Sequence, residues 1–192
     1  MEFLSGLQEY LKQSYHVSVF DQAYESKQPW EFHLHGHRII RTNVYTNLTY
    51  ALKIESNDTK RTDLSKTDIK MLYPSEISEA VRPLLKTDKK VANLALEPII
   101  TAAKRHHIKN KSLFPLMKER KVVFFTLLEG EVLKGLITGF SRYEITCSLK
   151  GGEPVFILRH AIHDLRDKKG RSFLKIFQAT RRDWRKSSLY VP

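Results

Sequence analysis

The sequence predicts a mainly β protein with helical segments, built from two small, strongly bent five-stranded barrels in tandem. Three observations predict this class. Short apolar runs with period-two alternation recur along the chain and are separated by turn residues. The pattern of residues 1–72 returns later in the chain at a constant offset. Hydrophobic residues make up 41% of the 192, which suffices for a core, and no apolar run approaches the roughly 20 residues of a membrane span.

The first block, residues 1–72, is predicted to begin with an amphipathic helix over 2–15, where apolar residues recur at helical spacing. Residues 16–20 alternate between polar and apolar side chains and are predicted to form a strand. Further strands are expected in two runs around Gly36 within 32–45, over 50–54 and within 64–72. Pro74 marks the end of the block.

Residues 73–111 are predicted to form a helical, basic connector. Ser75 stands before acidic residues, as at a helix start, and the apolar spacing over 91–108 is helical, with Pro98 as a kink or boundary. The run 104–111 is strongly basic. The segment lacks the Gly- and Ser-rich composition of a flexible linker.

The second block, residues 112–167, is predicted to hold a helix over 112–120 and strands over 121–128, 132–137, 143–149, 155–158 and 161–165. Gly151 and Gly152 form a hairpin turn signal. The glycines at 130, 135 and 139 suit the tight turns and strong bending that a small barrel requires.

An internal repeat relates the two blocks. An offset of 93 residues takes Val44, Tyr50, Leu52, Leu64, Ile69 and Leu72 onto Ile137, Tyr143, Ile145, Ile157, Ile162 and Leu165 without a gap. Aligning the N-terminal helix over 2–15 as well requires an insertion of about a dozen residues between Ala23 and Phe32. Because alternating strands match one another easily, coincidence is the alternative explanation.

The charge favours a polyanionic partner. Lys and Arg number 33 against 21 Asp and Glu, which gives +12 at pH 7. The tail, residues 168–192, is rich in cations interleaved with aromatic residues. Phe173 and Phe177, spaced i and i+4, are expected to pack on the core.

Several classes are not expected. Cys147 is the one cysteine, which excludes a disulfide framework or a multi-cysteine zinc site within one chain. Phosphate-loop, dinucleotide-binding, nucleophile-elbow and zinc-protease motifs are absent, so the protein is predicted not to be an enzyme and to need no cofactor. The N-terminus lacks a secretory pattern, so a reduced cytoplasm is the expected location and no membrane is an expected partner.

Residues 112–165 resemble the bacterial Hfq family of Sm-like proteins. The resemblance rests on the helix ending in Lys-Glu-Arg120, the apolar strand that follows, the Gly130 turn, the bent strand with Gly135, the segment from Gly139 to Ile145, and Leu158-Arg-His-Ala-Ile162. It implies an Sm-like, SH3-like barrel in the second block, a degenerate copy in the first, and assembly into a ring through edge strands. Three chains with two barrels each would close a six-barrel ring; the alternative is a monomer or dimer whose connector and tail cover the edges.

The resemblance also implies an RNA-binding rim. Its aromatic, basic and histidine roles fall on Tyr143, Arg159 and His160, with Arg142 adjacent; Phe140, Lys118, Arg120 and the first-block residues Tyr50 and Lys66 complete the candidates. A tyrosine ring can stack on a base, and Arg and His can bind phosphate or base edges. The structural alternative is that His160 satisfies a backbone carbonyl and Tyr143 fills the barrel. At the positions of His160 and Ala161 the first block has Thr67 and Asp68.

The family's adenine-binding pattern is not matched, because Thr126 and Lys134 stand where an aromatic residue and an amide are expected. The predicted function is therefore binding of single-stranded, U-rich RNA in post-transcriptional regulation. The alternative is an Sm-like protein-interaction scaffold without specific RNA binding.

A weaker candidate is a metal site. His33, His35 and His37 would share one face of a strand, and neutral imidazole is a common metal ligand. The alternative is a solvated strand, since Gly36 is expected to start a turn there.

Overall fold

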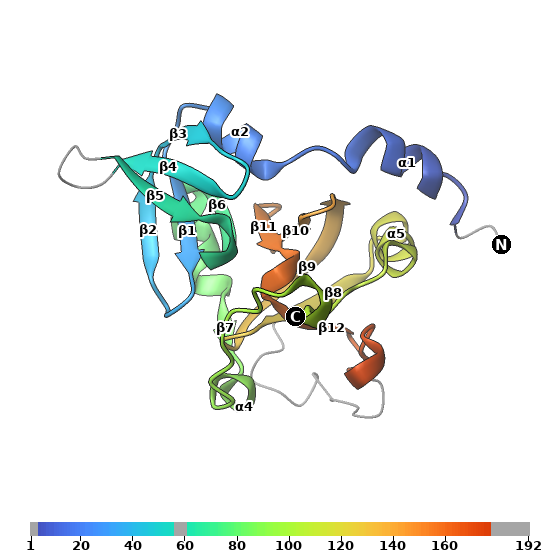
Figure 1. Cartoon of the computed structure of the whole chain (residues 1–192). Coiled ribbons are helices and arrows are strands. Elements are labelled where there is room, and N and C mark those ends of the chain that lie inside the picture. Colours follow the sequence, from blue (N-terminus) through green and yellow to red (C-terminus); the bar gives the residue numbers. More distant parts are fainter. Residues whose placement is uncertain (1–3, 56–60, 178–192) are drawn as a thin grey trace.

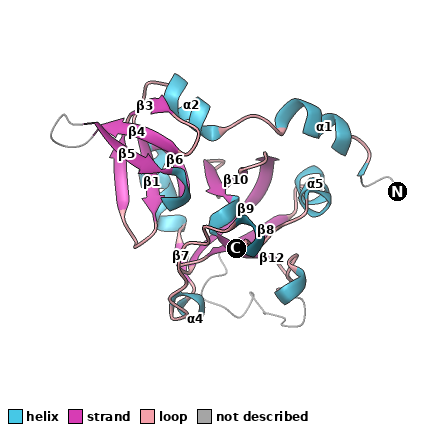
Figure 2. Cartoon of the chain, viewed as in Figure 1, coloured by secondary structure: helices cyan, strands magenta, loops and turns pink. Residues whose placement is uncertain are grey.

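The computed structural model describes residues 4–55 and 61–177, and these form a mainly β protein with short helices (Figures 1 and 2). The first half contains α1 (Leu7–Ser14), α2 (Val19–Glu25), β1 (Trp30–Leu34), β2 (Ile39–Thr42), β3 (Val44–Asn47), β4 (Ala51–Glu55), β5 (Arg61–Ser65) and β6 (Ile69–Pro74). The connector contains α3 (Ser78–Val81), β7 (Lys86–Thr87) and α4 (Lys89–Ala92). The second half contains α5 (Asn110–Lys118), β8 (Val122–Leu127), β9 (Glu131–Phe140), β10 (Glu144–Ser148), β11 (Pro154–Leu158) and β12 (Ile162–Asp167).

One antiparallel sheet runs through both blocks. Its strand order is β12-β8-β9-β10-β11-β6-β1-β2, with β7 paired to β9. The second block therefore contributes five consecutive neighbours, in which the last strand pairs with the first. The two blocks meet where β11 pairs with β6, with Phe156 opposite Leu72 and Ile157 opposite Met71.

The first block repeats the strand order of the second. β6-β1-β2 lie in the long sheet and β3-β4-β5 form a second sheet. The chain breaks between these sheets at Asn43, whereas β9 runs unbroken through the equivalent place. The offset of 93 residues relates the bounds of β4 to β10, β5 to β11, and β6 to β12. This agreement of bounds is not required by alternation alone.

Backbone hydrogen bonds follow the same offset. The N–H of Lys66 donates to the carbonyl of Tyr50 at 3.0 Å, and the N–H of Arg159 donates to the carbonyl of Tyr143 at 2.8 Å. Two other pairs repeat at 2.9 Å each: Leu48 to Ala51 with Ser141 to Glu144, and His35 to Asp68 with Leu128 to Ala161. The two blocks thus share their turns as well as their strands.

A difference between the blocks appears at the bend of β9. Gly135 has no side chain there, and an added Cβ would lie 2.3 Å from the Ser148 carbonyl oxygen. In the first block, Thr42 occupies the equivalent position, and its hydroxyl donates to the carbonyl of Glu55 at 2.9 Å. The close approach of strands at Gly135 is therefore replaced in the first block by a hydrogen bond, and the strand breaks one residue later.

Two apolar cores lie one on each side of the junction. The core of the first block includes Phe20, Trp30, Phe32 and Leu52, and Phe156 of β11 packs against it. The core of the second block includes Leu113, Phe125, Ile145 and Leu165. Cys147 lies in that second core, fully buried, and burial raises the pKa of its thiol to about 12. As predicted, Phe173 and Phe177 pack against the same core.

The predicted strand over 16–20 is wrong, because α2 begins at Val19. The Ser18 side chain accepts a hydrogen bond from the N–H of Phe20 at 3.3 Å and caps this helix. The offset of 93 places α2 within α5, so the block repeats with its helix and needs no insertion. Helix α1, as expected, forms near the N-terminus, but its Leu7 packs into the second block's core.

The predicted helix over 91–108 is also wrong. Helix α4 ends at Ala92, and Ala95 has a left-handed φ of 48°, which an α-helix does not contain. Beyond it, Ala102–Lys104 form a single 3₁₀ turn. Tail residues 178–192 lie outside the described residues. No helix among those the structure describes is both long and apolar enough to cross a membrane.

Candidate nucleic-acid interface

Two exposed tyrosines stand at equivalent places in the blocks. Tyr143 is 53% exposed and lies in the turn before β10. Tyr50 is 85% exposed and lies in the turn before β4. The Arg142 guanidinium lies 5.6 Å from the centre of the Tyr143 ring. Both rings are large apolar groups left in solvent, and Tyr143 also has a cation beside it, the arrangement that stacks on unpaired bases.

Lys66 lies next to Tyr50 but is held inward. Its ammonium donates to the carbonyl of Leu48 at 2.5 Å and lies 4.9 Å from the ring centre of Phe20. Burial lowers the pKa of Lys66. Its side chain therefore supports the turn that carries Tyr50.

Arg159 and His160 make internal contacts. The Arg159 guanidinium donates to the carbonyl of Ile108 at 3.2 Å and to Asn110 Oδ1 at 3.0 Å. His160 Nε2 lies 2.8 Å from the carbonyl oxygen of Ile69, and burial lowers the pKa of this histidine to about 4. The structure therefore brings His160 to a backbone carbonyl, the structural alternative considered from the sequence, and the RNA-binding role of both residues stays a prediction.

The other sequence candidates separate into exposed and buried groups. Phe140 is 3% exposed, and its ring centre lies 4.7 Å from that of Tyr10 and 5.7 Å from the Arg159 guanidinium. Arg120, Arg142 and Lys118 are exposed, and the Lys118 ammonium donates to the carbonyl of Ser5 at 3.3 Å. Of these candidates, Phe140 is placed for packing and the cations for contact with solvent or ligand.

A basic cavity of about 1000 Å³ lies between α5 and the segment after β12. Its cations come from two distant parts of the chain: Arg120, Lys121, Lys168, Lys169 and Arg171. Its apolar floor includes Pro115, Leu116, Val122 and Phe173. Sequence reasoning identified Arg120 and the basic tail separately and missed their meeting, which depends on the path of the chain after Asp167.

The three histidines of the metal hypothesis do not share one set of partners. His33 Nε2 lies 2.7 Å from the hydroxyl of Tyr73 and 3.2 Å from a carboxylate oxygen of Glu31. Glu31 is fully buried and accepts hydrogen bonds from the Arg82 guanidinium at 2.6 and 3.0 Å. His33 thus belongs to a buried ion-pair network within the first block and its neighbouring turn.

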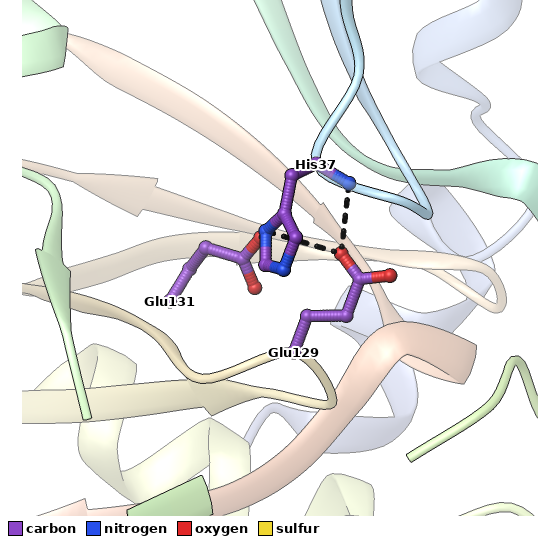
Figure 3. A group of neighbouring side chains, drawn as sticks. All are labelled: His37, Glu129 and Glu131. Carbon is purple, nitrogen blue, oxygen red and sulfur yellow. Dashed lines mark hydrogen bonds and ion pairs between the residues drawn. The ribbon is translucent and has the colours of Figure 1, made fainter. Parts of the chain in front are cut away.

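His37 instead faces two glutamates of the second block (Figure 3). Its Nδ1 lies 3.6 Å from Glu129 and 3.8 Å from Glu131, and the possible ligand atoms of the three residues lie within 4.8 Å of one another. The buried Lys70 ammonium donates to both carboxylates. Since this ammonium already supplies the cation, the arrangement is that of a salt-bridge network joining the blocks.

Glu129 is the centre of this network. It also accepts hydrogen bonds from the backbone N–H groups of Gly36, at 2.6 Å, and His37, at 3.3 Å. Burial alone would raise the pKa of Glu129, but these bonds and Lys70 lower it to about 2. The buried ring of His35 lies 3.4 Å from the same carboxylate, and burial lowers the pKa of His35.

Comparison with family models gives no match, and no curated protein matches the chain. A solved structure described as the pleiotropic translational regulator Hfq, at 1.55 Å resolution, is similar in part. It shares 23% sequence identity over 36% of this chain and 98% of that chain, with a TM-score of 0.30.

Proposed function

We propose that this chain binds single-stranded RNA through two Sm-like barrels fused in one polypeptide. The observation that carries the proposal is the pair of exposed tyrosines, Tyr50 and Tyr143, at equivalent positions of two blocks with one strand order. The helix followed by five antiparallel strands is the arrangement that the resemblance implied for the second block. The common offset of strands and turns supports the same arrangement in the first.

The chemistry of the exposed groups favours unpaired bases. Aromatic rings stack on bases that a duplex keeps hidden, and a guanidinium beside the ring binds phosphate or adds a cation–π contact. The net charge of +12 adds a sequence-independent attraction to the backbone. The basic cavity between Arg120 and Lys168 offers phosphates a second contact region.

The experiment measures binding of fluorescent oligo-uridine and oligo-adenosine, each about 15 nucleotides long, at two salt concentrations. The variants are Tyr143→Ala, Tyr50→Ala and the double variant. The matched control is Tyr24→Ala, since Tyr24 is also exposed, at 38%, and has the Lys27 ammonium 5.3 Å from its ring centre. Each lost stacking contact costs about 1–3 kcal/mol, so we expect about 5- to 150-fold weaker binding per variant and no change in the control.

A second candidate is an interaction scaffold of the same fold without specific RNA binding. The internal bonding of Arg159 and His160 favours it, because these side chains are occupied within the protein. RNA binding that depends on salt but is unchanged in the double tyrosine variant would support the scaffold and overturn RNA recognition. A preference for oligo-uridine that the double variant loses would support the RNA proposal.

A further inference from the structure

The junction of the two blocks shows how a neighbouring strand, β11, covers the edge strand of the first block, β6. On β6, Leu72 is opposite Phe156 of β11. The Phe156 ring lies 5.7 Å from the ring centre of Trp30 and packs on the first block's core. An aromatic residue opposite a buried leucine therefore covers this edge of the first block.

The equivalent edge of the second block is the outer side of β12, where Leu165 takes the place of Leu72. Here the covering residue comes from the segment that directly follows β12. The N–H of Phe173 donates to the Leu165 carbonyl at 2.8 Å, and Arg166 pairs with Ser172 in an antiparallel bridge. Phe173 therefore lies opposite Leu165 as Phe156 lies opposite Leu72.

Several contacts hold the capping segment, residues 171–174, against β12. The chain turns back at Gly170, whose φ is 76°, and the N–H of Asp167 donates to the Arg171 carbonyl at 3.0 Å. The Ser172 side chain is buried and its hydroxyl donates to Asp164 at 2.6 Å. Leu174 is 4% exposed and belongs to the second block's core. These contacts hold the segment against β12 through a single antiparallel bridge and buried side chains.

The other outer edge of the two-block unit is β5. Among the described residues β5 pairs only with β4. Arg61, Thr62 and Asp63 of β5 are exposed, and Asp63 stands at the position that Phe156 holds in β11. A charged residue on an open edge opposes pairing with another strand, which is a common protection of exposed edges.

We propose that the capping segment takes, on β12, the place of a strand from a second copy of this chain, and that the protein is monomeric while the segment is docked. The strand that it excludes is β5 of the second copy. The offset of 93 makes β5 the counterpart of β11 and β12 the counterpart of β6, and β11 pairs with β6 at the junction. The three-chain ring expected from the sequence would use this same edge. The inference depends on the strand pairing and stands apart from RNA binding.

The first test is the mass of the full chain in solution by sedimentation velocity over a wide range of concentration. The native protein is expected at its monomer mass of 22.4 kDa. Phe173→Pro removes both the ring and the N–H that binds Leu165, and we expect this variant to associate as its concentration rises. Ile176→Ala, at a residue that is 65% exposed, is the control and should stay monomeric.

Hydrogen exchange at the Phe173 amide shows in the native protein whether the segment is docked. A native trimer with that amide protected would overturn the proposal. A Phe173→Pro variant that is folded by circular dichroism, has lost protection in the neighbouring 172 and 174 amides and stays monomeric would also overturn it. Phe173→Ser, which keeps the N–H, replaces the proline variant if the latter does not fold.

A second pair of variants tests the occupant. In the chain with Phe173→Pro, adding Asp63→Phe supplies the aromatic residue that β11 has at this position, and we expect association at least tenfold tighter, roughly the effect of one buried aromatic contact. Thr62→Phe is the matched control, because neighbouring residues of a strand point to opposite faces. Equal association with and without Asp63→Phe would exclude β5 as the occupant.

Discussion

The carboxylate of Glu144, the first residue of β10, accepts a hydrogen bond at 3.1 Å from the backbone N–H of Val19, the first residue of α2. A residue of the second block thus binds the start of the first block's helix. The N–H of Arg142 also donates to the carbonyl of Tyr15 at 3.1 Å. The turn that presents Tyr143 is therefore tied to the segment before α2.

Glu144 should make stability depend on pH. Burial raises the pKa of this carboxyl above its usual range, although hydrogen bonds from Ser141 and Val19 oppose the change. A raised carboxyl pKa stabilises the fold below the unfolded value, near about 4.3, and that contribution is lost as pH rises through the folded value. We expect Glu144→Gln, which keeps an acceptor for Val19, to gain stability relative to the native protein across this rise. Urea unfolding of both proteins at several pH values measures it; a constant difference would contradict the expectation.

Lys70 should be indispensable to the contact between the blocks. Its side chain is 1% exposed, and it donates to both Glu129 and Glu131. Lys70→Met leaves two carboxylates facing one another without a cation, and we expect a loss of about 3 kcal/mol in the free energy of unfolding. Adding Glu129→Gln to this variant should recover part of the loss. Denaturant unfolding checks both, and a larger loss in the double variant would contradict the ion-pair interpretation.

Glu129 should also make the free energy of unfolding depend on pH, in the opposite direction to Glu144. Its pKa of about 2 lies below the unfolded value, so its contribution is present above about pH 4.3 and is lost as pH falls toward 2. Glu129→Gln should therefore be less stable than the native protein at neutral pH, and the two should converge as the pH is lowered. Thermal unfolding across the acid range measures the convergence; parallel curves would contradict it.

Gly135 should tolerate no side chain. A Cβ at this position would lie 2.3 Å from the Ser148 carbonyl oxygen and 2.5 Å from Cys147 Sγ, both in the neighbouring strand. We expect Gly135→Ala to cost about 3 kcal/mol through forced strand separation. Gly139→Ala is the control on the same strand, because its nearest contact would be 3.5 Å. Equal unfolding midpoints for the two variants would contradict the packing argument.

The sequence predicted most second-block elements because each has a local signal. Residues 151–152 carry a hairpin turn, and both glycines have positive φ. Helix α2 was missed because 16–20 alternate like a strand, yet Ser18, followed by Asp21, was an available helix-start signal. Extending the offset of 93 without a gap to residue 19 would also have found it. The prediction of a helix over 91–108 was wrong because apolar residues at helical spacing form a stable helix only when they pack on a core.

Tyr50 and Tyr143 were candidates because of the family resemblance, and the sequence placed them at the first positions of strands that in fact begin one residue later. The directions of other side chains could not be predicted in this way. Arg159 turns inward because Ile108 and Asn110, about 50 residues earlier in the chain, supply its acceptors. Similarly, Lys70 meets Glu129, which is 59 positions later in the chain, only after the two blocks dock. Contacts set by tertiary structure carry no local pattern, so neither was predictable from spacing.

Joining β6 and β11 in one polypeptide changes how the pairing responds to protein concentration. Separate chains that pair by such edges lose the contact on dilution, because each association costs the translational entropy of a free chain. Here the 79 residues between the ends of the two strands keep the partners at a high effective concentration, and the contact forms within one molecule. The temperature at which the junction opens should therefore be independent of dilution, so the surface made by the two blocks stays intact even at low protein concentration.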